Sequence, residues 1–141
     1  KWFLLPDLIN YLIIALGIIN SLLIILFAYN KTAALIDIVG STLILSGLYL
    51  FLYIISKGKW IGFGDIKLGL GLALLLADWK LAFIALFAAN FIGCLIVIPA
   101  MIAGKLKRNS HVPFGPLLIV GTIIAGLFGS YLVNMFFYTL V

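Results

Sequence analysis

Long stretches without any charged residue constrain the fold of this chain more than any other feature of its sequence. There are four of them, at residues 8–30, 38–56, 81–104 and 112–141. Each is close to or above the roughly 20 apolar residues that an α-helix needs to cross a bilayer. Only 9% of the 141 residues are charged, against about 25% in a soluble domain. The sequence therefore predicts an all-α fold, a polytopic bundle of membrane helices that forms one domain over residues 1–141, and excludes a soluble protein.

About five transmembrane helices are expected, at residues 8–29, 38–56, 66–77, 81–104 and from 117 to the C-terminus. A polar loop is expected at 30–37, and Pro99 is expected to kink the fourth helix. The third helix has 12 residues, about 18 Å, which is too short to cross a membrane alone. Irregular backbone at membrane depth must be buried in protein or line a wet cavity. We therefore expect a glycine-containing break at 62–64 to dip below the membrane surface and enclose Asp65.

Small residues recur every four positions on three of the expected helices, a pattern that lets membrane helices approach closely. They are Gly69, Ala73 and Ala77 on the third helix, Ala85, Ala89 and Gly93 on the fourth, and Gly121, Ala125 and Gly129 on the fifth. Asp65 stands four positions before Gly69, at the head of the first of these rows. We therefore expect its side chain to face the bundle rather than lipid.

The basic residues predict the orientation of the helices. If the helices alternate in direction, seven of the nine lie on one side: Lys1, Lys57, Lys59, Lys67, Lys105, Lys107 and Arg108. Lys and Arg are enriched in cytoplasmic loops, so this side is expected in the cytoplasm, with Asp65 on it. The net charge of +5 is explained in the same way, and no nucleic-acid partner is expected.

Asp65 lies in the segment Gly-Phe-Gly-Asp-Ile-Lys-Leu at residues 62–68. In a chain with 14 glycines, a glycine turn with Asp65 as a helix cap is the simplest interpretation. The short following helix, the row of small residues and the nearby Lys67 favour a functional site instead, because ionisable groups at membrane depth are costly. Gly62 and Gly64 would let a peptide backbone approach the carboxylate closely.

Three segments resemble the signatures of type IV prepilin peptidases, a family of membrane-embedded aspartic proteases. Residues 62–68 resemble its Gly-x-Gly-Asp-x-Lys-Leu signature. Leu-Leu-Pro-Asp at 4–7 resembles its Leu-Pro-Asp run before a membrane helix, and Val-Pro-Phe-Gly-Pro at 112–116 resembles its Ile-Pro-Phe-Gly-Pro run before the last helix. The three segments occur in the family's order and at predicted helix boundaries.

The resemblance implies that two aspartates at the cytoplasmic membrane face cleave a peptide bond. Asp65 matches one of them, with Gly62, Gly64 and Lys67 shaping the site; Lys67 either tunes its electrostatics or extends to the membrane surface. The other catalytic aspartate is expected just upstream of Lys1, so the chain would hold the last five helices of a six-helix peptidase domain, N-terminally truncated and inactive alone. Asp7 is a less favoured substitute, because an acid at a helix start is an ordinary structural feature.

The implied reaction is cleavage of the leader peptides of type IV prepilins or pseudopilins, in a multi-pass protein of the cytoplasmic membrane that serves pilus assembly or protein secretion. The expected partners are such a substrate and the lipid bilayer. Some bacterial members of the family carry a methyltransferase domain with cysteine pairs, and no such pairs occur here.

Two other functions compete with this one. A protease that resembles presenilin or signal peptide peptidase would carry a Pro-Ala-Leu motif, which is absent. A small transporter or assembly subunit would use Asp65 and Lys67 on an ion or proton path, but transporters favour inverted repeats and charges at the membrane midplane. No cofactor or metal is expected, because Cys94 and His111 are single residues without partners at ligand spacing; we expect a buried small residue and a loop histidine.

Overall fold

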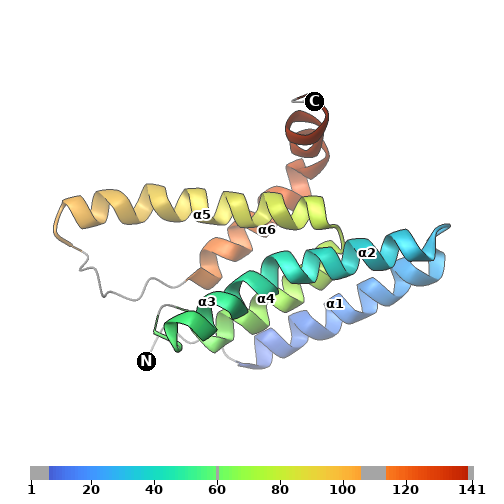
Figure 1. Cartoon of the computed structure of the whole chain (residues 1–141), viewed down its shortest axis with the longest axis horizontal. Helices are drawn as coiled ribbons and strands as arrows, with labels where there is room; N and C mark the ends of the chain where they lie inside the picture. The colour runs from blue at the N-terminus through green and yellow to red at the C-terminus, as the bar shows by residue number, and fades with distance from the viewer. Residues whose placement is uncertain (1–6, 60, 106–113, 140–141) are drawn as a thin grey trace.

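The described part of the chain, residues 7–59, 61–105 and 114–139 of the computed structural model, is helical and contains no strand (Figure 1). Its elements in chain order are α1 (Asp7–Phe27), α2 (Lys31–Thr42), η1 (Leu43–Gly47), α3 (Leu48–Ser56), α4 (Phe63–Leu76), α5 (Trp79–Ile102), α6 (Phe114–Val133) and η2 (Asn134–Tyr138). The elements η1 and η2 are single π-helical turns.

The predicted all-α membrane bundle is confirmed, because four helices are long and apolar enough to cross a membrane. They are α1, the continuous helix α2–η1–α3 of 26 residues (Lys31–Ser56), α5, and α6 together with η2. The fifth helical segment, α4, has 14 residues and a length of about 21 Å, short of the roughly 30 Å hydrocarbon core. It was expected to be short, and it is not a spanning segment by itself.

The polar loop predicted at 30–37 is wrong, because the helix already begins at Lys31. Asn30 is its N-cap, and its side-chain oxygen accepts a hydrogen bond from the Ala33 backbone N–H at 3.3 Å. The Thr32 hydroxyl donates to the same oxygen at 2.6 Å. This capping satisfies backbone donors that a helix start leaves free, so polar residues can occupy the first turns.

The glycine break before α4 is shorter than predicted. Gly62 is the N-cap in extended conformation, with φ −76° and ψ 147°, and the helix begins at Phe63. Gly64 and Asp65 are therefore helical rather than part of an irregular loop. The end of α4 is set by Ala77, whose φ of 48° stops the helix, and Asp78 then caps α5 by accepting from the Lys80 N–H at 2.8 Å.

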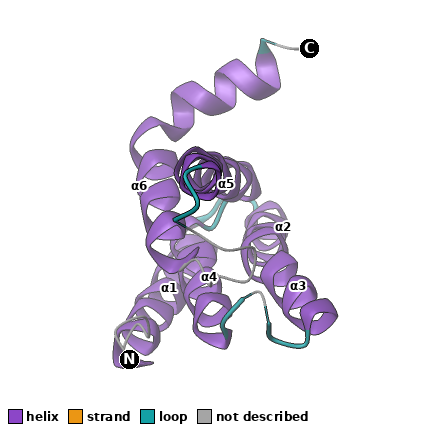
Figure 2. Ribbon diagram, turned by 90° about the vertical axis from the view of Figure 1, so that its left-hand side faces the viewer, coloured by secondary structure: helices purple, strands orange, loops and turns teal. Residues whose placement is uncertain are grey.

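The helices form two groups that meet along α2, η1 and α4. Helices α1, α4 and α2–η1–α3 lie side by side, and α5 and α6 pack on each other and against this group (Figure 2). The small residues predicted at the contacts are all buried: Gly69, Ala73, Ala77, Ala85, Ala89, Gly93, Gly121, Ala125 and Gly129. The carbonyl of Leu45 in η1 lies only 3.0 Å from where a Cβ on Gly69 would stand, so the π-helical turn packs directly on this row.

Predictions were also made for two other residues of α5, Cys94 and Pro99. Cys94 is exposed on α5, so the prediction of a buried cysteine is wrong; its helix face is turned away from the core. Pro99 lies inside α5, close to its end, and the kink expected there stays a prediction.

Hydrogen bonds from α1 and α2 to carbonyl oxygens of α4 hold this group together. The Ser21 hydroxyl donates to the Leu74 carbonyl at 2.9 Å, and the Asn20 amide donates to the Leu75 carbonyl at 2.9 Å. The fully buried Ser41 of α2 donates to the Ala73 carbonyl at 2.8 Å. Hydroxyl and amide groups of this kind join helices where no water is present to compete.

Candidate active site

The first turn of α4 holds Asp65 at the end of the bundle where α4 and α6 both begin. The Asp65 backbone N–H donates to the Gly62 carbonyl at 3.1 Å, which closes the first helical turn. The side chain is half-buried. The local sequence places it there because Gly62 ends the extended segment and the helix starts one residue later.

The Asp65 carboxylate accepts hydrogen bonds from the backbone N–H groups of Gly62 and Gly115. Gly115 belongs to the first turn of α6 and to the segment 112–116, of which Val112 and Pro113 lie outside the described residues. Two segments that the sequence analysis singled out separately therefore meet at one carboxylate. Backbone N–H groups at the start of a helix have no partner within the helix and carry the positive end of its dipole, so they suit a carboxylate.

Burial of Asp65 raises the pKa of its carboxyl group, and the hydrogen bonds from Gly115 and Gly62 lower it only in part. Desolvation disfavours the charged form, whereas the two N–H groups favour it. The carboxyl group therefore keeps its proton to a higher pH than an ordinary aspartate does. A proton held in this way is what a general acid requires.

Tyr49 of α3 is part of the same site, although the sequence analysis did not single it out. Its side chain is 2% exposed, and it interacts electrostatically with Asp65. The centre of its ring lies 6.4 Å from the centre of the Phe114 ring. Phe114 directly precedes Gly115 in the chain. Nothing in the sequence distinguishes Tyr49, because Phe51 and Tyr53 are further aromatic residues of the same apolar helix.

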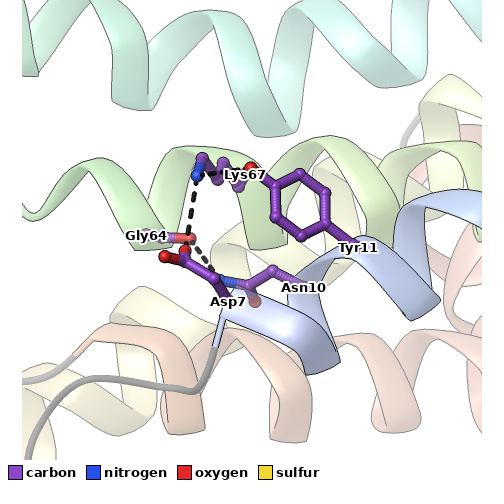
Figure 3. Close-up of polar contacts among 5 residues, drawn as sticks. All are labelled: Asp7, Asn10, Tyr11, Gly64 and Lys67. Carbon is purple, nitrogen blue, oxygen red and sulfur yellow. Dashed lines mark hydrogen bonds and ion pairs between the residues drawn. The ribbon is translucent and has the colours of Figure 1, made fainter.

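Lys67 turns toward α1, where its partners are Asp7 and Tyr11 (Figure 3). Its ammonium group donates to Asp7 at 3.3 Å and to the Tyr11 hydroxyl at 3.2 Å, and lies 4.9 Å from the centre of the Tyr11 ring. The hydrogen bond with Tyr11, together with Asp7, raises the pKa of Lys67, so the lysine stays charged. Lys67 and Asp7 thus join the start of α1 to α4.

Asp7 is the partner of this lysine, and its side chain is 70% exposed. Next to it, the buried Asn10 donates to the Gly64 carbonyl at 3.4 Å. A Cβ on Gly64 would meet only the Asn10 amide nitrogen, at 3.8 Å, and one on Gly62 would meet only the Asp65 carboxylate, at 4.0 Å. Packing within the protein therefore leaves room at both glycines, and their role in shaping the site for a substrate stays a prediction.

Among residues 7–59, 61–105 and 114–139, no three His, Cys, Asp or Glu side chains lie together in a way that could hold a metal ion. His111 lies outside the described residues. The second catalytic aspartate that the resemblance implies stays a prediction. The described site therefore contains one carboxyl group, two backbone N–H donors and one tyrosine hydroxyl.

Comparison with known proteins points to the same group of enzymes as the three sequence segments. The chain is 32% identical over 90 residues to a protein of Bacillus subtilis (strain 168) named prepilin leader peptidase/N-methyltransferase. The match covers 62% of this chain and 36% of that protein, so the chain spans little more than a third of the relative's length. No protein-family model and no solved structure matches the chain.

Proposed function

We propose that this chain is the membrane part of an aspartic endopeptidase that cleaves the leader peptides of type IV prepilins or pseudopilins at the cytoplasmic face of the cell membrane. The observation that carries the proposal is the setting of Asp65. Its half-buried carboxyl group lies where the segments 62–68 and 112–116 meet, the two segments whose sequences resemble prepilin peptidase signatures. The similarity to a protein named as a prepilin leader peptidase supports the same reaction.

In this proposal Asp65 is the acid of a pair of carboxyl groups. The second carboxylate, expected from an aspartate upstream of Lys1, removes a proton from a water molecule as the water oxygen bonds to the carbonyl carbon of the peptide. Asp65 donates its proton to the carbonyl oxygen, which becomes a hydroxyl group in the tetrahedral intermediate. The second carboxyl group then gives the proton that it took from water to the nitrogen, and the C–N bond breaks. One hydroxyl of the intermediate returns its proton to Asp65 as the carbonyl reforms, so the leader leaves with a new carboxyl group and both catalytic groups regain their starting protonation.

The structural features of Asp65 fit the acid of this pair. Burial raises the pKa of its carboxyl group and so favours the protonated form, whereas the base must be ionised. After proton transfer, the N–H groups of Gly62 and Gly115 stabilise the carboxylate that remains. The same two donors therefore make loss of the proton possible at a site where burial opposes it.

The test uses the full-length gene product in membranes with a synthetic prepilin. Asp65→Asn is expected to reduce cleavage at least about 100-fold, because an amide cannot donate the proton. Asparagine at the expected upstream aspartate should do the same. Asp7→Asn is the matched control, because Asp7 pairs with Lys67 at 3.3 Å on the far side of the first turn of α4, and it should retain cleavage. Cleavage at the wild-type rate by Asp65→Asn would refute the proposal.

A further inference from the structure

An open groove with apolar walls lies where α5 meets the end of α6 and the turn η2 (Figure 1). Its volume is about 170 Å³, and its walls are Phe83, Ile84, Phe87, Ala88, Phe91, Leu132 and Phe136. The three phenylalanines of α5 are each about half exposed, and an exposed side chain of a spanning helix meets lipid. A groove left empty there would lose dispersion contacts along its walls, so an apolar ligand would fill it favourably.

A lysine stands at one end of this groove. Lys80 precedes the wall residue Phe83 by one turn of α5, and its ammonium group donates to the Tyr138 hydroxyl at 3.1 Å. The ammonium also lies 5.8 Å from the centre of the Trp79 ring. Tryptophan and tyrosine are enriched where a membrane meets water. This end of the groove therefore suits the level of the lipid headgroups, at the end of the bundle opposite to Asp65.

The Lys80 ammonium can still bind an anion. It carries three N–H donors, of which the Tyr138 hydroxyl takes one. The carboxylates of Asp78 and Asp37 interact with it electrostatically, but within residues 7–59, 61–105 and 114–139 neither forms an ion pair with it. Asp78 instead accepts from the Lys80 backbone N–H at 2.8 Å. Two donors of the ammonium thus remain for a ligand.

The dimensions of the groove match one lipid chain. Phe91, at the far end, follows Lys80 by 11 positions in the same helix, which corresponds to about 16 Å. One leaflet is half of a hydrocarbon core roughly 30 Å thick, so the groove runs from headgroup level to the middle of the membrane. A helix about 10–12 Å in diameter could cover a groove of this volume but is too wide to enter it.

We propose that this groove binds an anionic phospholipid, with one acyl chain against the phenylalanines of α5 and the headgroup phosphate on the Lys80 ammonium. A lysine close to the membrane surface attracts lipids with a net negative charge. A zwitterionic headgroup would bring a second, positive charge next to the same lysine and would be favoured less. The inference is independent of the proposed function, because the groove and Asp65 lie at opposite ends of the bundle.

The test measures lipid binding to the full-length gene product in detergent by native mass spectrometry. Phosphatidylglycerol and phosphatidylcholine with identical acyl chains are the probes, and the wild type should prefer the first by about fivefold, the effect of one lysine near an anionic surface. Lys80→Gln should abolish the preference, and Lys80→Arg, which keeps the charge, should retain it. Ala88→Leu should weaken binding of both lipids at least about threefold, because the larger side chain overfills the groove.

Two matched controls separate the groove from general effects. Lys31→Gln removes the same charge at the start of α2, at the same end of the bundle, and Cys94→Leu adds bulk at an exposed position of α5 outside the groove. Both should bind the lipids as the wild type does. Equal affinity of the wild type for the two lipids would overturn the inference, as would an equal loss of preference in Lys31→Gln. A lipid-free dimer that Ala88→Leu dissociates would also overturn it, because a second copy would then cover the groove.

Discussion

The contact between α1 and α4 should be sensitive to one methyl group at Gly17. A Cβ at this position would stand 2.7 Å from the Leu74 Cβ and 2.8 Å from the Gly71 carbonyl oxygen. Both atoms belong to or adjoin the backbone of α4, so neither can move aside alone. Gly17→Ala should therefore force the two helices apart.

The size of the effect follows from these distances. An ordinary contact begins at 3.4 Å, so the helices must separate by about 0.7 Å. The same movement would lengthen the 2.9 Å bond from Ser21 to the Leu74 carbonyl to about 3.6 Å, beyond hydrogen-bonding distance. Overpacking costs about 1–3 kcal/mol and a lost bond between membrane helices about 0.6 kcal/mol, while alanine gains up to about 1 kcal/mol in helix propensity. We expect a net loss of about 0.6–2.6 kcal/mol.

The assay is reversible unfolding of the purified protein in mixed detergent micelles, followed by circular dichroism. Gly126→Ala is the matched control, because a Cβ on Gly126 would meet nothing within 4 Å, and it should be neutral or stabilising. If Gly17→Ala unfolds with the same free energy as the wild type and Gly126→Ala, helices α1 and α4 do not pack as closely as described, and the reasoning is refuted.

Three further predictions concern buried polar groups. Ser41→Ala should lower the free energy of unfolding by about 1 kcal/mol in the same assay, because it removes the 2.8 Å hydrogen bond to the Ala73 carbonyl. The control Thr42→Val removes a hydroxyl bonded within its own helix and should change the free energy of unfolding by less than half as much. Equal effects of the two substitutions would contradict the role of Ser41 in joining α2 to α4. Folding raises the Asp65 pKa, so the contribution of this group to the free energy of unfolding is fully present below the unfolded-state pKa of about 3.9 and is lost as pH rises through the folded-state pKa. Asp65→Asn should therefore be more stable than the wild type at pH 7 and equally stable near pH 3. A difference in free energy of unfolding that does not change with pH would speak against the raised pKa. A hydrophobic carbodiimide, which reacts with protonated carboxyl groups, should label Asp65 at pH values where an exposed aspartate in a reference peptide no longer reacts, as measured by mass spectrometry; equal pH dependence in both would contradict the effect of burial.

The sequence reveals the spanning helices because lipid imposes a simple rule on charge. The charge-free stretches mark segments that suit lipid, whereas the rows of small residues mark contacts between helices. The structure buries every one of those small residues. The start of α2 escaped prediction because Lys31, Thr32 and Asp37 look like loop residues, and the capping by Asn30 that accommodates them is a local hydrogen-bonding detail.

The site was only partly predictable for a different reason. Asp65 stands out because a carboxylate is rare and costly in an apolar chain. Tyr49 does not, because its importance depends on which face of α3 meets α4 and α6, and that is a matter of long-range packing. The pairing of Lys67 with Asp7 across 60 positions in sequence was likewise invisible, and the role of Lys67 in shaping the site stays a prediction.

The π-helical turn η1 makes the length of one membrane helix as important as its composition. A π-turn contains one residue more than an α-turn, and it lies between Ser41 and Tyr49, which both face α4. Deletion of one residue from 43–47 would leave 25 apolar residues of the original 26, still ample to cross a bilayer. It would also rotate α3 by about 100° relative to α2 and carry the Tyr49 ring away from Phe114. Insertions and deletions in this helix would thus be silent for membrane insertion and damaging for the site, which makes alignment gaps there a sensitive indicator of whether a related sequence keeps the same chemistry.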